Sequence, residues 1–82
     1  MTYTIHVTQD DIKQGCPQEF WRCPIAHAMA RAIGEPIGVR HAWYRKSDLF
    51  APNWLPQRAV RFVDRFDAGL PVKPFQFTVE TD

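Results

Sequence analysis

The sequence predicts one globular domain of the α+β class over residues 1–82, with two to three helices packed on one face of a small mixed or antiparallel sheet of three to four strands. Strand-like segments, in which every second residue is apolar, lie near both ends of the chain and in its middle. Segments with helical periodicity lie between them and are bounded by proline and glycine. The 82 residues are 45% hydrophobic, which is enough for one core and leaves no room for a second domain.

The N-terminal segment alternates between apolar and polar side chains over residues 2–8, which predicts a half-buried strand. Thr8 stands directly before a Gln-Asp-Asp sequence, so we expect it to cap a short helix over residues 9–14. Gly15 suits the end of this helix. Residues 16–23 show no period, and we expect them to form a loop with partly buried aromatic side chains.

A second helix is expected to begin at Pro24, because proline fits the first helical position, where its missing N–H costs nothing. Gly34 and Pro36 are expected to end this helix. Its apolar face, at helical spacing, consists of Ile25, Ala28, Met29, Ala32 and Ile33.

Alternation returns over residues 37–45 and predicts a second strand as one continuous element. The turn-rich connection over residues 47–55 leaves room for a short third strand around Leu49 and Phe50. In the continuous strand, one side, expected to face inward, carries Ile37, Val39, His41 and Trp43, and the other carries Gly38, Arg40, Ala42 and Tyr44.

The C-terminal part predicts a third helix and a final strand. The helix is expected to follow Pro56, to cover residues 57–68 and to end at Gly69. Alternation over residues 75–80 predicts the last strand. Across all segments, the side chains expected in the core are Ile25, Met29, Val60, Val63, Phe75 and Phe77.

The overall charge favours no particular class of partner. The net charge is +1, from 10 Lys and Arg against 9 Asp and Glu, so it gives no reason to expect nucleic acid or an acidic membrane. No apolar stretch approaches the roughly 20 residues that span a bilayer, and the first residues do not resemble a secretion signal. We therefore expect a cytoplasmic protein with no membrane partner, and its motifs indicate no cofactor.

The candidates for metal binding are Cys16, Cys23, His27 and His41, which have the residue types that zinc prefers. Six residues separate the two cysteines, against roughly two to four in common zinc motifs, so we expect no metal site and two free thiols. Whether the cysteines pair or share a metal is not decided by the sequence.

Cys23 also stands at the expected start of a helix, where backbone N–H groups and Arg22 would favour a thiolate. A nucleophile needs a base beside it, and the sequence places none there. We therefore do not expect an enzyme.

Two sets of residues are candidates for binding a partner. The first combines aromatic and basic residues around the middle strand and the following loop, because tryptophan, tyrosine and arginine dominate interface hot spots. The second is a row of arginines on the third helix, which is also typical of a solvated helix face. The first set is Arg40, Tyr44, Arg45, Lys46 and Trp54, with Tyr44 expected to be exposed, and the second is Arg58, Arg61 and Arg65.

Two motifs, Cys-Pro-Ile-Ala from Cys23 and Asp-Ala-Gly-Leu-Pro-Val-Lys-Pro-Phe from Asp67, give the chain a family likeness. Together with the segment over residues 5–12 they resemble short uncharacterised proteins of bacteriophages and prophages. Some of those proteins have a second cysteine where this chain has Phe20. The resemblance implies a viral or prophage origin and no particular activity.

The function expected from these observations is binding of a host protein or of a protein–nucleic-acid complex in the cytoplasm of a bacterial cell. Such binding would inhibit a host defence or another host process. The alternative is a weak nucleic-acid-binding module, and the third option is an enzyme or a zinc-binding domain. The sequence does not decide between a monomer and a dimer.

Overall fold

The computed structural model describes residues 2–46 and 53–80 of the chain. The strand expected around Leu49 and Phe50 lies outside the described residues. Within them the α+β class is confirmed, with three helices and strands that form two small antiparallel sheets. No helix in the described ranges is long and apolar enough to cross a membrane.

The N-terminal elements follow the sequence prediction closely. Strand β1 (Thr2–Val7) leads into helix α1 (Gln9–Gln14), and Gly15 ends this helix with an extended backbone. Thr8 and Asp11 form a reciprocal cap: the Asp11 N–H donates to Thr8 Oγ1 at 3.2 Å, and the Thr8 N–H donates to Asp11 Oδ2 at 2.9 Å. The short helix is therefore stabilised by its own first turn.

Helix α2 (Pro24–Ile33) begins at the predicted proline and ends at Gly34, whose φ of 88° needs the freedom of glycine. Its buried face lies nearer the N-terminal end than the spacing predicts, because Ala26 is buried while Ala32 is exposed. Ile25 and Met29 are fully buried, as expected.

The predicted continuous strand over 37–45 is wrong. The segment instead forms a hairpin of β2 (Ile37–Arg40) and β3 (Trp43–Lys46), joined by a two-residue turn in which His41 has a φ of 51°. The short strand β4 (Asn53–Trp54) pairs with β3 to complete a three-stranded sheet.

Helix α3 (Gln57–Asp67) and strand β5 (Phe75–Glu80) confirm the C-terminal prediction. Val63 and Phe77 are buried in the core, while Val60 and Phe75 pack against it half-buried.

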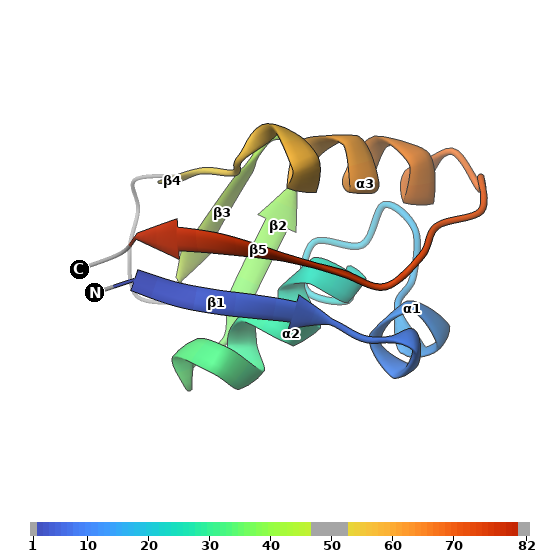
Figure 1. The fold of residues 1–82 in the computed structure, drawn as a ribbon. Helices are drawn as coiled ribbons and strands as arrows, with labels where there is room; N and C mark the ends of the chain where they lie inside the picture. The colour runs from blue at the N-terminus through green and yellow to red at the C-terminus, as the bar shows by residue number, and fades with distance from the viewer. Residues whose placement is uncertain (1, 47–52, 81–82) are drawn as a thin grey trace.

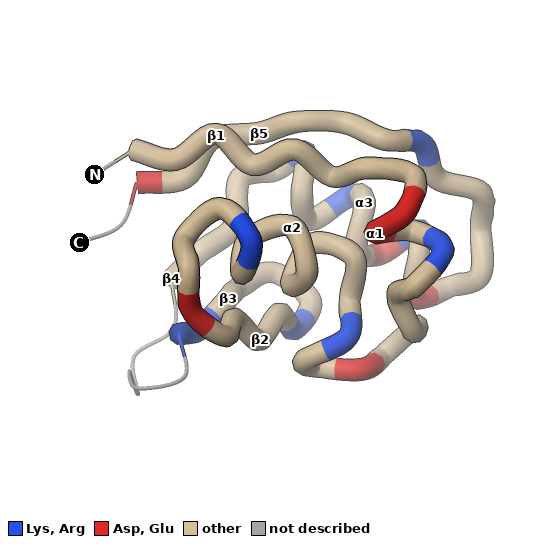
Figure 2. Tube along the Cα trace, turned by 90° about the horizontal axis from the view of Figure 1, so that it is seen from below, with Lys and Arg blue, Asp and Glu red and all other residues tan. Residues whose placement is uncertain are grey.

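The five strands divide between two sheets in place of the one sheet that the sequence suggests. Strand β5 pairs antiparallel with β1 as a two-stranded ribbon, with Ile5 opposite Phe77. Figure 2 shows this ribbon on one side of the molecule and strands β2 and β3 on the other, with α2 between them, and Figure 1 shows α3 beside the strands on the side away from α2. Helix α2 contacts both β1 and β2, so one core joins the two sheets.

Candidate binding surfaces

The outer face of the three-stranded sheet collects aromatic and basic side chains. Register places Arg40 opposite Trp43 and Gly38 opposite Arg45, so these four residues share one face of the hairpin. Trp54 of β4 lies opposite Trp43 and extends the same face. The loop before α2 adds Phe20 and Trp21. We call this surface, made of Phe20, Trp21, Arg40, Trp43, Arg45 and Trp54, the tryptophan–arginine face.

Gly38 is the reason the loop can lie on the sheet. The ring of Phe20 covers this glycine so closely that a Cβ at residue 38 would meet a ring carbon at 1.8 Å. The Val39 N–H donates a hydrogen bond of 2.8 Å to the Phe20 carbonyl and holds the loop against the edge of β2. The ring of Phe20 then contacts Trp21 and Trp43 edge-on, with centroid distances of 4.8 and 5.8 Å.

Both arginines of this face lie over the same ring. The Cζ atoms of Arg40 and Arg45 are 5.8 and 5.4 Å from the Phe20 centroid, within the range of a cation–π interaction. Around them the surface forms a hollow of about 360 Å³, whose described lining has two cations and no acid. The hollow therefore combines positive charge with aromatic surface.

The structure corrects the expected positions of three residues: Tyr44 and Lys46 of the first candidate set, and Trp43 beside it. Tyr44 is 1% exposed and Lys46 is 7% exposed, so both lie on the inner side of the sheet and are not available to a partner. The reason is the hairpin turn, which places Tyr44 opposite Val39 and thereby on the core side. Trp43, expected inward, is on the outer face. Arg40 and Trp54 are exposed, and Arg45 lies half-buried on the outer face of the sheet.

The second candidate set also comes together in space. Arg58, Arg61 and Arg65 of α3 lie along a groove of about 350 Å³, where Lys73 joins them from the segment before β5. We call this hollow the arginine groove. Its apolar lining is supplied by Phe62, Val72 and Phe75, with Pro71 at the side.

Two of the groove arginines are positioned by contacts within the chain. The Arg65 guanidinium donates to the Pro71 carbonyl from Nη2 at 3.0 Å and from Nε at 3.3 Å. Arg58 Cζ lies 5.9 Å from the centroid of the Phe75 ring. Arg61 makes no hydrogen bond or ion pair with the described residues, so its charge is available to a ligand.

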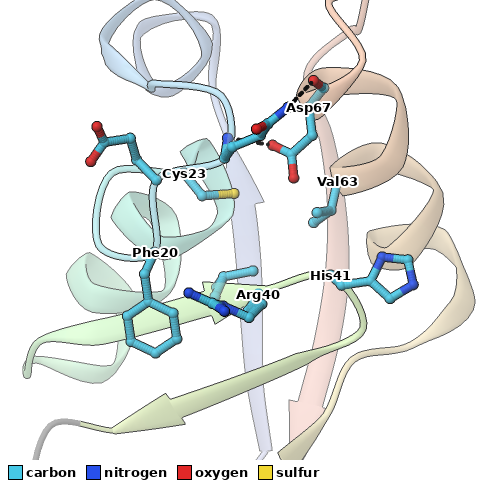
Figure 3. Close-up of a pocket in the computed structure, with 9 residues that line it drawn as sticks. Phe20, Cys23, Arg40, His41, Val63 and Asp67 are labelled. Atoms are coloured by element: carbon cyan, nitrogen blue, oxygen red, sulfur yellow. Dashed lines mark hydrogen bonds between the residues drawn. The ribbon is translucent and has the colours of Figure 1, made fainter.

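A third hollow, of about 300 Å³, lies beside Cys23 and is shown in Figure 3. Burial raises the pKa of the Cys23 thiol to about 11, although the backbone N–H groups of Ile25 and Ala26 act to lower it. In Figure 3 the His41 imidazole points away from the Cys23 sulfur, and its Nδ1 lies 3.0 Å from Asp64 Oδ1. The raised pKa keeps the Cys23 thiol protonated at neutral pH, and the carboxylate of Asp67, which lines the same hollow, also acts to raise that pKa.

The four residues considered for zinc do not converge. Cys16 and Cys23 are both free thiols, the first half-buried and the second buried. Within residues 2–46 and 53–80 no three His, Cys, Asp or Glu side chains form a group that could hold a metal ion.

The two candidate sets named from the sequence leave out Phe20, Trp21, Trp43 and Lys73. The sequence does contain a signal for Phe20, because an isolated glycine inside a strand, here Gly38, marks the close approach of another group. Nothing in the local sequence shows that Lys73 meets α3, since that contact depends on the path of the chain after the helix.

Searches of protein-family models, of curated proteins and of solved structures give no match to this chain.

Proposed function

We propose that this protein is a binding protein whose tryptophan–arginine face engages a host protein or a protein–nucleic-acid complex. The observation that carries the proposal is the exposure of large aromatic side chains beside cations on one sheet face. Trp54 is 73% exposed and Trp21 is 47% exposed. Tryptophan and arginine are the residues most enriched in interface hot spots, and exposed tryptophans that share a surface mark a binding site.

The geometry also lowers the entropy cost of binding. Phe20 is seated on Gly38, and its carbonyl is bonded to β2, so the loop that carries Trp21 is already ordered before a partner arrives. The two arginines are gathered over the same ring, which favours a partner surface with negative charge.

The source of the partner follows from the resemblance to short phage and prophage proteins. A protein of that kind acts in the cytoplasm of the bacterial cell, where it would bind a host component and inhibit a defence or another host process. A partner that is itself a protein–nucleic-acid complex would offer both acidic side chains and phosphates to the arginines.

A second candidate function is binding of single-stranded nucleic acid. It is favoured by one observation, the placement of Arg40 and Arg45 next to exposed aromatic rings. Bases stack on aromatic side chains while arginines contact phosphates, and such binding weakens steeply as salt rises.

The test compares three immobilised proteins in a lysate of a bacterial host, with bound proteins identified by mass spectrometry. They are the parent, the double variant Trp54→Ala with Arg45→Glu, and the control Lys13→Glu, which reverses a charge on α1 away from the face. We expect the parent and the control to retain the same partner and the double variant to lose it. Circular dichroism checks that all three are folded.

Retention of that partner by the folded double variant would show that the tryptophan–arginine face is not the site. Nuclease treatment of the lysate separates the two candidate functions. If capture disappears with nuclease, and a single-stranded oligothymidylate binds the parent with a steep salt dependence, the nucleic-acid function replaces the protein-binding one.

A further inference from the structure

We propose that the arginine groove is a second binding site, which takes an extended acidic peptide segment carrying one bulky apolar side chain. The groove is separate from the tryptophan–arginine face, since the described linings of the two share no residue. The proposal does not depend on the function assigned to that face.

Charge is the first argument. Four of the 10 basic residues of the chain line this one groove, and no acid is among the described residues that line it. The acids of α3 lie on its other flank, where Asp64 meets His41 and Asp67 accepts a hydrogen bond of 2.9 Å from the Gln18 N–H. The groove therefore presents an unneutralised positive charge, which attracts an acidic partner.

The spacing of the cations suits an extended chain. Arg58, Arg61 and Arg65 lie three and four residues apart on one side of α3, so the row is about 10 Å long at the helical rise of about 1.5 Å per residue. Alternate side chains of an extended peptide are about 6.6 Å apart on the same side. Two or three acidic side chains of one short segment can thus meet the row together.

The apolar floor distinguishes a peptide from a nucleic acid. The ring of Phe75 is stacked against Phe62 at 5.0 Å and against Phe77 at 5.5 Å, with Arg58 near it as well. Its faces are therefore already occupied within the protein, and a nucleic-acid base has no free ring on which to stack. The apolar surface left for a ligand consists of Val72 and the ring edges of Phe62 and Phe75, and it lies between the cations. A surface of this kind fits an aliphatic or aromatic side chain.

The experiment measures fluorescence anisotropy of a labelled peptide, Asp-Glu-Phe-Glu-Asp, against the full chain. The matched proteins are the parent, Arg61→Glu in the groove and Lys13→Glu on α1, since both variants reverse one exposed cation. The matched probes are the same peptide with alanine in place of phenylalanine and an oligothymidylate. Trp54→Ala with Arg45→Glu reports on the other face.

We expect Arg61→Glu to weaken binding of the phenylalanine peptide by about tenfold or more, which corresponds to about 1.4 kcal/mol. Lys13→Glu and the double variant are expected to change it by less than about twofold. The alanine peptide should bind several-fold more weakly than the phenylalanine peptide.

Three results would overturn the proposal. One is the absence of binding by the parent at high protein concentration. Another is an equal loss in Arg61→Glu and Lys13→Glu, which would mean that only the net charge of the protein matters. The third is tighter binding of the oligothymidylate than of the peptide with the same dependence on Arg61, which would assign the groove to nucleic acid.

Discussion

In the tryptophan–arginine face the aromatic rings stand outside the sheet, whereas in the arginine groove they lie beneath the cations as its floor. Trp54 is 73% exposed, while Phe62 at the groove is 6% exposed. The first surface therefore offers a partner exposed rings beside two cations, and the second offers a largely apolar hollow lined by a row of cations. The difference teaches that the number of arginines does not by itself define a binding site, because the aromatic rings decide how much area a partner can bury.

The two surfaces also differ in what holds them in place. The groove rests on side chains of the core that come from α3 and β5. The tryptophan–arginine face depends on one packing contact, that of the Phe20 ring on Gly38. A change in the core should therefore damage the groove together with the fold, while a change at the glycine should damage the other face alone.

The largest effect is expected from Phe77→Ala, which removes a buried ring that stacks on Phe75 beneath the groove. The cost should be about 3–5 kcal/mol in the free energy of unfolding, because the deletion leaves a cavity in the core. Denaturant unfolding measures it, with Thr78→Ala on the exposed side of the same strand as the control. Phe77→Leu is the milder variant if the alanine protein does not fold.

A loss below about 1 kcal/mol in Phe77→Ala would mean that this side chain is not in the core, and that the inward side of β5 is misassigned.

A smaller effect is expected from Gly38→Ala, which places a methyl group against the ring of Phe20. The Phe20 ring has to move away from residue 38, which should lower the free energy of unfolding by about 1–3 kcal/mol. The loop that carries Trp21 should then lose its fixed position. Tryptophan fluorescence and denaturant unfolding report the change, and peptide binding in the arginine groove should be retained.

The Phe20→Ala background provides the control for Gly38→Ala, because the added methyl group no longer meets a ring there. Alanine stabilises a protein when it replaces glycine without a clash. If Gly38→Ala raises the stability of the protein that retains Phe20, then Phe20 does not cover Gly38.

The smallest effect is expected at Asp11. This residue lies in neither surface, so a change there should alter stability without altering binding. Burial acts to raise the pKa of Asp11, but hydrogen bonds from the Arg31 guanidinium and from Thr8 outweigh it and lower the pKa below its ordinary value of 3.8. The unfolded chain therefore binds a proton more readily than the folded one. The stability from this group is present above the unfolded pKa and is lost as pH falls through the folded pKa.

Asp11→Asn should accordingly flatten the fall in stability below about pH 4, and the difference from the parent should be less than about 1 kcal/mol. The effect is small because the Arg31 side chain is 55% exposed. Unfolding measured across acidic pH in both proteins isolates the contribution. Identical pH profiles would show that the pair with Arg31 does not stabilise the fold, and binding at either surface should be unaffected.

Local signals in the sequence were sufficient for most elements. The Thr8 cap, the Pro24 and Pro56 helix starts and the two terminal alternations each depend on neighbouring residues, and each is confirmed. The prediction from alternation is wrong at the hairpin. His41 and Ala42 form the turn without glycine or proline, so the apolar and polar residues go on alternating through it. A two-residue turn then exchanges the faces, which is why Tyr44 and Trp43 were assigned to the wrong sides.

The candidate surfaces could be predicted only in part for the same reason. Arg58, Arg61 and Arg65 share a helix, so their spacing alone places them on one side. Phe20 reaches the tryptophan–arginine face from a loop that shows no period, and only tertiary contacts bring it to Gly38. The residues that one element contributes to a surface are therefore predictable as a group, and the residues that other elements add are not.

The pairing of β1 with β5 has a consequence for how the chain folds. The hairpin of β2 and β3 closes over a two-residue turn, whereas the β1–β5 ribbon joins Thr2 to Glu80 and must order nearly the whole chain. Closing so long a loop costs more conformational entropy, and contacts between distant residues slow folding. On a ribosome, the apolar side chains of Ile5 and Val7 stay without their partner strand until β5 has emerged. The nascent protein is therefore exposed to misfolding until β5 is available to pair with β1.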